Sequence, residues 1–279
     1  MNRSTHARRP VVAILGGGNL GGALALGWTK AGYCAPDQLY ITRRQTDKLA
    51  DFAAAGFRVS ADNRAAVAAA DVLVLAVSPQ QLDALLVDVR SGVVPERHRI
   101  VSVVSGVSIA QLRNALGTEV SIVRATPNTA VAILESMTCL ATDDPRVAAL
   151  DETRALFDLL GRTLVVPESM MIPATALCAC GVAFFLRSIR AASQGGIEIG
   201  FHAEDALLLA AQTAKGAASL LLTDGRHPER EIDRVTTPRG CTIAGLNEME
   251  HQGFSSAMIK GILLSAAKAQ ELYPDDQAR

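Results

Sequence analysis

A glycine-rich turn near the start of the chain limits the folds that this sequence can adopt. The segment Gly16-Gly17-Gly18-Asn19-Leu20-Gly21 follows an apolar run at residues 11–15 and leads into a second apolar run at residues 20–31. In a Gly-x-Gly-x-x-Gly turn, the first glycine permits a tight bend, the second lets the backbone approach a pyrophosphate, and the third lets helix and strand pack closely. The phosphates then lie at the positive N-terminus of the helix. This order of elements predicts a dinucleotide site; the alternative is a glycine turn with only a structural role.

The pattern of the chain changes once, near residue 167. Before it, short runs of β-forming residues alternate with alanine-rich helical runs, as is typical of parallel βαβ units. Strands are expected at residues 11–15, 39–42, 57–59, 72–77, 100–104 and 121–124, and shorter ones at 137–141 and 163–166. Beyond it, helices are expected at residues 173–200, 204–223, 242–250 and 255–273. The sequence therefore predicts a disordered tail (1–10), an α/β Rossmann-type N-terminal domain (11–166) and an all-α helical dimerisation domain (167–279).

The helices of the second half are apolar around most of their circumference. In the run at residues 204–223, Leu207 to Leu209 and Leu220 to Leu222 cannot all share one face. A helix that is apolar all round must be buried. Because the predicted domain is too small to cover such helices by itself, we expect a homodimer, or a higher homo-oligomer, built through them.

Composition and charge exclude several kinds of partner. The 279 residues carry a formal net charge of −1, so no global field attracts nucleic acid or an anionic membrane. The most apolar stretch, residues 174–186, is shorter than the roughly 20 residues of a spanning helix. The tail with Arg3, Arg8 and Arg9 has no apolar core like that of a secretory signal. We therefore expect neither a nucleic-acid partner nor a membrane.

The cysteines favour a reducing compartment. The five are scattered through the chain, which suits buried thiols better than a disulfide framework. Cys178 and Cys180 form only a Cys-x-Cys pair, whereas a zinc site needs four ligands with wider spacing. The prediction is a cytoplasmic protein without a metal site.

The end of the second expected strand indicates which dinucleotide is bound. NAD-dependent folds of this type place an acidic residue there for the ribose hydroxyls, but this chain has Thr42-Arg43-Arg44. Guanidinium groups match the geometry of a 2′-phosphate, which a carboxylate would repel. This favours NADP(H) over NAD(H), with a solvated basic turn as the alternative.

Four segments together resemble the pyrroline-5-carboxylate reductase family, and the resemblance covers nearly the whole chain after residue 10. Three lie in the first half: residues 11–23, the run Asp71-Val72-Leu73-Val74-Leu75-Ala76-Val77-Ser78-Pro79-Gln80, and the run Arg124-Ala125-Thr126-Pro127-Asn128-Thr129. The fourth, Asp233-Arg234-Val235-Thr236-Thr237-Pro238-Arg239-Gly240-Cys241-Thr242, is similar to the loop that opens a helix in that family. The resemblance implies NADPH-dependent reduction of a cyclic imine acid, 1-pyrroline-5-carboxylate, to L-proline.

The resemblance and the motifs together give a set of cofactor-binding residues. The glycine turn contributes Gly16, Gly18 and Gly21, with Asn19 and Leu20 implied at the pyrophosphate. The resemblance places Asn63 near the adenosine ribose. It also places a group of residues on the nicotinamide side: Ala76, Val77, Ser78, Pro79 and Asn128.

A second helix start is the candidate substrate site. Backbone N–H groups at the start of a helix can hold the carboxylate of an amino-acid-like substrate without a dedicated cation. Thr237, Gly240, Cys241 and Thr242 stand at such a start. The Thr242 hydroxyl is the candidate catalytic donor to the imine nitrogen or carboxylate; the alternative is an ordinary capping hydroxyl. His227 and His251 are expected to be solvated.

Departures from the family pattern leave the substrate open. Ser78 stands where the family usually has lysine, residues 178–184 lack several expected hydroxyls and a proline, and Arg190 and Arg239 replace an acidic residue and a glycine. If these arginines face the substrate, they favour a more acidic cyclic imine, and piperideine-type imines are a further alternative. If they are surface features, the substrate is unchanged.

Two other classes compete with the imine reductase. A β-hydroxyacid dehydrogenase has the same two-part plan but uses a catalytic lysine on the first long helix, and residues 175–200 contain none. A dinucleotide-binding dimer without turnover would bind NADPH but show no imine-dependent oxidation of it.

Overall fold

The structure is a computed structural model of the chain and describes residues 9–117, 119–225 and 227–273. Most of the expected disordered tail lies outside these residues. Within them, Arg9 is held in place: its guanidinium donates to the Gly32 carbonyl at 2.6 Å and also to the Tyr33 carbonyl, and it lies 5.6 Å from the centre of the Tyr33 ring.

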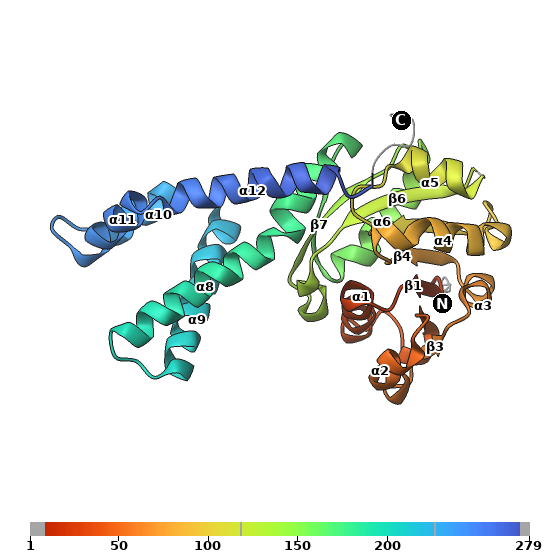
Figure 1. Cartoon of the computed structure of the whole chain (residues 1–279), viewed down its shortest axis with the longest axis horizontal. Coiled ribbons are helices and arrows are strands. Elements are labelled where there is room, and N and C mark those ends of the chain that lie inside the picture. The colour runs from red at the N-terminus through yellow and green to blue at the C-terminus, as the bar shows by residue number, and fades with distance from the viewer. Residues whose placement is uncertain (1–8, 118, 226, 274–279) are drawn as a thin grey trace, which may run out of the picture. The chain divides into compact units, whose positions relative to one another are not determined.

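The first half of the chain forms one eight-stranded sheet in the order β3-β2-β1-β4-β5-β6-β7-β8 (Figure 1). Neighbouring strands are parallel except for β6 and β7, which are antiparallel. The strands are β1 (Val12–Leu15), β2 (Leu39–Thr42), β3 (Arg58–Ser60), β4 (Val72–Leu75), β5 (Arg99–Ser102), β6 (Ser121–Thr126), β7 (Ser136–Ala141) and β8 (Gly161–Val165). All the expected strands are confirmed, with small shifts at their ends.

Helices cover both faces of this sheet because its strands are apolar on both sides. The helices are α1 (Asn19–Lys30), α2 (Ala50–Ala54), α3 (Asn63–Ala69), α4 (Pro79–Val89), α5 (Ile109–Leu116) and α6 (Val147–Asp158). Alternate strand residues enter two cores: α3, α4 and α5 pack on one face, and α1, α2 and α6 on the other. The second core is anchored by Trp28, which donates to the Leu156 carbonyl at 3.0 Å and packs edge-on against Phe157.

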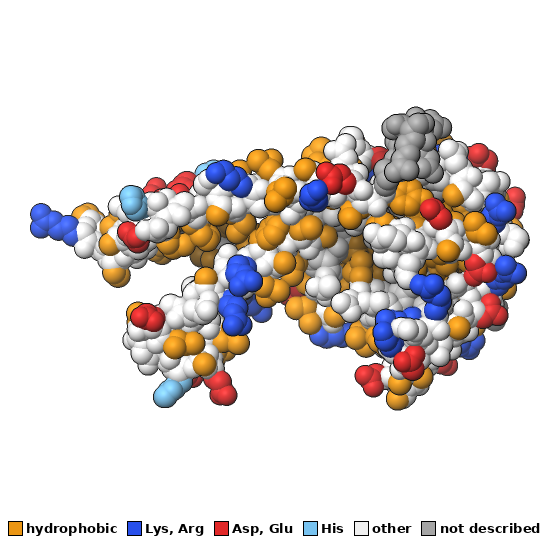
Figure 2. Space-filling model, in the orientation of Figure 1, with side chains coloured by type: hydrophobic (Ala, Val, Ile, Leu, Met, Phe, Trp, Pro, Cys, Tyr) orange, Lys and Arg blue, Asp and Glu red, His pale blue; other side chains and the backbone are white. Residues whose placement is uncertain are grey.

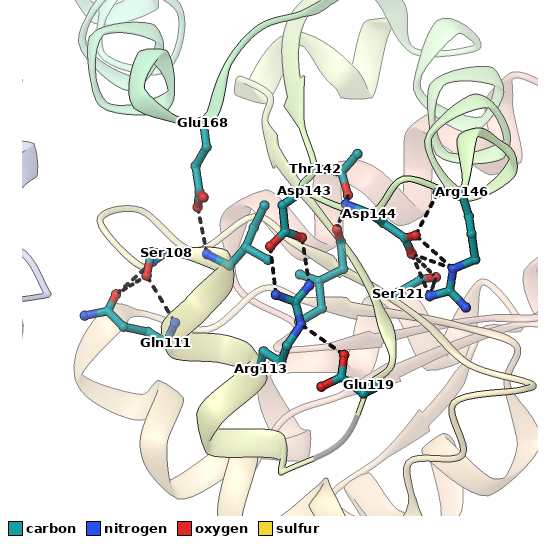
Figure 3. A network of polar contacts seen from close by, with 12 residues as sticks. Ser108, Gln111, Arg113, Glu119, Ser121, Thr142, Asp143, Asp144, Arg146 and Glu168 are labelled. Carbon is teal, nitrogen blue, oxygen red and sulfur yellow. Dashed lines mark hydrogen bonds and ion pairs between the residues drawn. The ribbon is translucent and has the colours of Figure 1, made fainter.

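A network of ion pairs ties together the loops around the start of β6 and the end of β7 (Figure 3). Arg113 binds both carboxylate oxygens of Asp143 at 2.7 Å. Asp144 accepts from Arg146 at 2.7 Å and from the Ser121 hydroxyl at 2.6 Å. Arg113, Asp143, Asp144 and Arg146 line a hollow of about 410 Å³ at the edge of the sheet opposite the glycine turn. Because their charges are satisfied by one another, the network is structural.

The contacts within the chain divide it into two compact units. The first comprises the chain up to Ala179 together with the part from Ser265 onward, and the second comprises Cys180–Leu264. The sequence pattern changes earlier, near residue 167, because α7 (Met171–Ala174) and a π-helical turn (Thr175–Ala179) are helical yet pack with the sheet unit. The expected helix at residues 173–200 is therefore interrupted before α8 (Gly181–Glu198).

The second unit contains helices only. These are α8, α9 (Ala203–Asp224), α10 (Pro228–Val235), α11 (Cys241–His251) and most of α12 (Phe254–Gln270). Helices α8 and α9 pack against each other, yet many large apolar side chains stay uncovered in the single chain (Figure 2). Leu207 and Leu208 are 54% and 67% exposed, and Leu263 and Leu264 are each 64% exposed.

By length and composition, two helical stretches could also cross a membrane: Glu168–Glu198 and Ala203–Thr223. The first is longer than the apolar stretch at residues 174–186 on which the sequence-based argument against a membrane rests. The length of these helices alone therefore does not show whether a membrane or a partner subunit covers them.

Candidate functional site

The glycine turn lies between the ends of three strands. The register pairs Leu15 of β1 with Thr42 of β2 and with Leu75 of β4, so these strands end side by side. The N–H groups of Gly16 and Gly17 both donate to the Thr42 carbonyl, at 3.2 and 2.7 Å. The strand order reverses between β1 and β4, which is where ligands bind in open α/β sheets.

Two of the glycines have no room for a side chain. Gly16 has a φ of 123°, and a Cβ there would lie 2.4 Å from the Ala76 carbonyl oxygen. A Cβ on Gly21 would lie 2.1 Å from the Gly16 carbonyl oxygen. Gly18 precedes α1 with no side-chain cap, and Asn19 and Leu20 form the first turn. The start of α1 therefore offers uncapped N–H groups to an anion, as pyrophosphate binding requires.

The three residues of the segment Thr42-Arg43-Arg44 lie in different environments. Thr42 is buried, and its hydroxyl donates to the Asn63 side-chain oxygen at 2.6 Å; Asn63 in turn donates to Asp88 at 3.0 Å. The Arg43 guanidinium donates to the Gly17 carbonyl at 2.8 Å, so it holds the glycine turn. Arg44 is exposed. The sequence contained no signal for the Arg43–Gly17 bond or for Asp88 as a partner of Asn63.

The residues after β4 and β6 lie along the same edge of the sheet. Ala76 and Val77 are half-buried, Ser78 is exposed at the N-cap of α4, and Pro79 is the first residue of that helix. Beyond β6, Asn128 is 9% exposed. Because β1, β4 and β6 run in the same direction, the structure brings the expected cofactor residues together at their carboxyl ends.

Asn128 is fixed by three hydrogen bonds. Its side-chain oxygen accepts from the Ala130 N–H at 3.0 Å, its amide nitrogen donates to the Cys178 carbonyl at 3.3 Å, and its own backbone N–H donates to Ser136 Oγ at 3.3 Å. Neither Ser136 nor Cys178 was singled out for this role from the sequence. The bond to Cys178 joins the sheet edge to the π-helical turn.

The candidate substrate residues form a tight turn at the start of α11, in the helical unit. The Gly240 N–H donates to the Thr237 carbonyl at 2.9 Å, and a Cβ on Gly240 would lie 2.4 Å from Thr237 Oγ1. Gly240 is the N-cap of α11 and supplies no side-chain cap, while Cys241 and the half-buried Thr242 open the helix. This start can accept a small carboxylate.

The remaining side chains considered from the sequence are exposed in the single chain. Arg187, Arg190 and Arg239 are exposed, as are His227 and His251. His227 caps α10 by accepting from the Glu229 N–H at 3.3 Å. Of the part of the chain that the structure describes, no group of His, Cys, Asp and Glu side chains could hold a metal ion.

A doubly wound sheet with an uncapped glycine turn at its switch point defines a dinucleotide-dependent oxidoreductase. Residues 11–106 match the family model described as NADP oxidoreductase, coenzyme F420-dependent, and residues 168–272 match that described as pyrroline-5-carboxylate reductase dimerisation. The chain is 46% identical to pyrroline-5-carboxylate reductase 2 of Dictyostelium discoideum, covering 93% of this chain and 92% of that protein. The chain belongs to the pyrroline-5-carboxylate reductase family.

Two further similarities support this family assignment. Pyrroline-5-carboxylate reductase 1 of Dictyostelium discoideum is 50% identical over 95% of this chain, which spans 50% of that longer relative. The crystal structure of Plasmodium falciparum pyrroline carboxylate reductase with NADP bound has a TM-score of 0.85 at 21% identity, covering 95% of this chain and 98% of that one. The latter shows that the fold is shared along almost the whole length of both chains.

Proposed function

We propose that this protein reduces 1-pyrroline-5-carboxylate to L-proline with NADPH. The observation that carries the proposal is the pair of uncapped helix starts, one at the glycine turn and one at Gly240, in a member of this reductase family. The first start suits a pyrophosphate and the second a substrate carboxylate. The reaction belongs to the oxidoreductases that act on CH–NH bonds.

The chain's own residues need only bind and orient for this reaction. The open space at Gly18, where a Cβ would meet no atom within 4 Å, fits the close approach of a dinucleotide. NADPH supplies the hydride when bound, and a protonated imine is the acceptor, so positioning provides most of the rate enhancement. In this proposal the N–H groups of Cys241 and Thr242 hold the carboxylate, next to the turn formed by Thr237 and Gly240. The Thr242 hydroxyl donates to the imine nitrogen before that nitrogen is protonated, or to the carboxylate.

The cofactor preference rests on the turn after β2. Arg44 is exposed there and free to pair with a 2′-phosphate, while Arg43 is already bonded to the glycine turn. We therefore assign the phosphate contact chiefly to Arg44, with Thr42 and Asn63 shaping the ribose side. The other dinucleotide contacts are those proposed above: Gly16, Gly18, Asn19, Leu20, Gly21, Ala76, Val77, Ser78, Pro79 and Asn128.

The uncovered helices support a homodimer built through the second unit. The match of residues 168–272 to a dimerisation model favours a second copy over a membrane as the cover for the exposed leucines. A cytoplasmic location accompanies this proposal.

A steady-state panel tests the function. Purified protein is assayed with NADPH and NADH against 1-pyrroline-5-carboxylate, piperideine-2-carboxylate and a bulkier cyclic imine acid. The proposal expects the highest kcat/KM with NADPH and 1-pyrroline-5-carboxylate. A better second imine would change the substrate, and NADPH binding without imine-dependent oxidation would favour the non-catalytic dimer.

Matched variants test the cofactor assignment. Arg44→Asp is expected to lower the NADPH-to-NADH ratio of kcat/KM by about tenfold or more, since a charged pair is replaced by repulsion. Arg162→Asp, an exposed substitution on β8, should leave the ratio unchanged. A wild-type preference for NADH would contradict the assignment of NADPH preference.

A further inference from the structure

Two cysteines meet where the first unit ends. Cys139 lies in β7 and is 4% exposed, and Cys178 lies in the π-helical turn Thr175–Ala179 and is half-buried. Both belong to a small apolar cluster with Ala141, Met171 and Ala174. The strand and the turn that carry them contact each other, and both thiols are free.

The position of Cys178 gives this pair a route to the cofactor site. Its carbonyl accepts the Asn128 side-chain amide at 3.3 Å, and the boundary between the two compact units falls directly after Ala179. Single π-helical turns depart from the regular helix and occur frequently at functional sites. A change at the Cys178 sulfur therefore acts on a turn that is joined to Asn128 and stands next to the junction of the units.

We propose that Cys139 and Cys178 are a redox-modification site that forms a reversible disulfide and thereby lowers the activity of the enzyme. A disulfide in a reducing compartment is typically transient and redox-sensing. The S–S bond of about 2.05 Å is shorter than any non-bonded contact between two sulfur atoms, so its formation draws the turn toward β7. The effect on activity rests on the proposed function, which puts Asn128 on the nicotinamide side. The formation of the disulfide does not depend on that function.

The chemistry balances with a peroxide as the oxidant. The Cys139 thiolate attacks one oxygen of hydrogen peroxide, the O–O bond breaks, and the departing hydroxide takes up a proton to become water. Cys178 then attacks the sulfenic sulfur, the S–O bond breaks, and a second water leaves with the Cys178 proton. The two thiols lose two electrons to the peroxide, and a dithiol reductant reverses the step.

The interaction between the two thiols assists the first step. Interaction with the Cys178 thiol stabilises the Cys139 thiolate and lowers the pKa of Cys139, whereas the pKa of Cys178 is raised. Since the thiolate is the reactive form, Cys139 is the attacking sulfur and Cys178 is the proton-bearing partner.

Peptide mapping tests the bond directly. The native full-length protein is treated with hydrogen peroxide, its remaining thiols are alkylated, and the linked peptides are identified by mass. The expected result is a Cys139–Cys178 link that dithiothreitol removes, together with a several-fold reversible loss of kcat/KM for NADPH. Cys180→Ser, which removes the neighbouring cysteine only, should still form the link.

Cys178→Ser separates oxidation from packing. Its hydroxyl can still donate to Cys139, so the fold and the activity before peroxide treatment are expected to persist. Peroxide should then leave a Cys139 sulfenic acid, which dimedone traps. Absence of the link in peroxide-treated wild type, or an equal reversible loss of activity in Cys178→Ser, would overturn the proposal. Because the link is read by mass, a wild type that forms it but reduces no imine contradicts the proposed function and not the modification site.

Discussion

Arg239 adopts a backbone conformation that a side chain makes costly. Its φ is 61°, in the left-handed region, and it immediately precedes the Gly240 cap of α11. Such conformations in non-glycine residues cost of order 1–3 kcal/mol and are informative when they occur next to a binding site. Arg239, which stands where the resemblance to the family predicts a glycine, is thus also under strain in the proposed substrate turn.

Arg239→Gly is expected to stabilise the protein by about 1 kcal/mol, because glycine relieves the strain. Arg239→Ala removes the same guanidinium but keeps the Cβ, so it should give no such gain. The free energy of unfolding in urea measures both. If the guanidinium binds an acidic substrate, both variants also lose kcat/KM equally, and if it is a surface feature, neither does. Equal stability of the two variants would contradict the strain.

Asp144 provides a stability that depends on pH. Hydrogen bonds from Arg146 first, and then from Ser121, hold the pKa of its carboxyl well below the ordinary 3.8 (Figure 3). A depressed folded-state pKa stabilises the folded protein above the unfolded-state pKa, and this contribution is lost as the pH falls toward the folded-state value. The network should therefore be strongest at neutral pH and weaken below about pH 4.

Asp144→Asn is expected to cost about 1–3 kcal/mol at pH 7, the range for a hydrogen-bonded charged group. The difference from wild type should shrink in urea unfolding below about pH 4, where this carboxyl begins to take up a proton in the unfolded chain but not yet in the folded protein. Asp51→Asn, an exposed substitution on α2, is the control and should change stability little at either pH. A difference for Asp144→Asn that did not vary with pH would refute the assignment.

The turn between β1 and α1 is the element on which the proposed cofactor binding depends. Its glycines differ in the side chains that they tolerate. Gly21 packs on the Gly16 carbonyl, whereas a Cβ on Gly18 would meet no atom within 4 Å. Gly21 is therefore needed for the fold itself, while Gly18 leaves space at the helix start for a ligand. This distinction agrees with the roles that the motif assigns to its second and third glycines.

Gly21→Ala is expected to destabilise the protein by about 3 kcal/mol or more, because a backbone oxygen cannot move aside as a side chain can. Gly18→Ala should alter the free energy of unfolding by less than about 0.5 kcal/mol while weakening NADPH binding. Urea unfolding and fluorescence titration of NADPH measure the two effects. Equal loss of stability in both variants would contradict the packing argument.

Among the helices and strands, the spacing of hydrophobic residues and the turn residues were sufficient to predict every strand of the sheet. They were not sufficient for α10, whose eight residues are mostly charged and carry no apolar run. The break at Thr175–Ala179 was also missed, because its residues continue the apolar pattern of the helices on either side. Site residues on one strand end were predictable, but partners such as Asp88 and Cys178 depend on tertiary contacts.

At the scale of the whole molecule, large apolar side chains stay uncovered on the described part of the helical unit. Ile259, Leu263 and Leu264 on α12 are all more than half exposed. A second copy that covered them would contribute the burial that a single chain lacks, at roughly 25 cal/mol per Å² of apolar surface. The proposed dimer thus completes the core of the second unit.

Leu263→Asp is expected to convert the dimer into monomer at micromolar concentration, since it places a charge in the apolar interface. Sedimentation velocity measures the change. Val87→Asp introduces the same charge at a side chain of α4 that is 62% exposed, and it should leave the oligomer intact. A Leu263→Asp protein that sedimented like the wild type would argue against an interface on α12.

The path of the chain has a consequence for its synthesis. The part from Ser265 onward belongs to the first unit, where Ala269 is buried against Gly106 and the Tyr273 hydroxyl bonds to Asp83. Domains made early in translation generally fold before the rest emerges. Here the sheet unit, although most of it is made first, lacks part of its own surface until α12 leaves the ribosome.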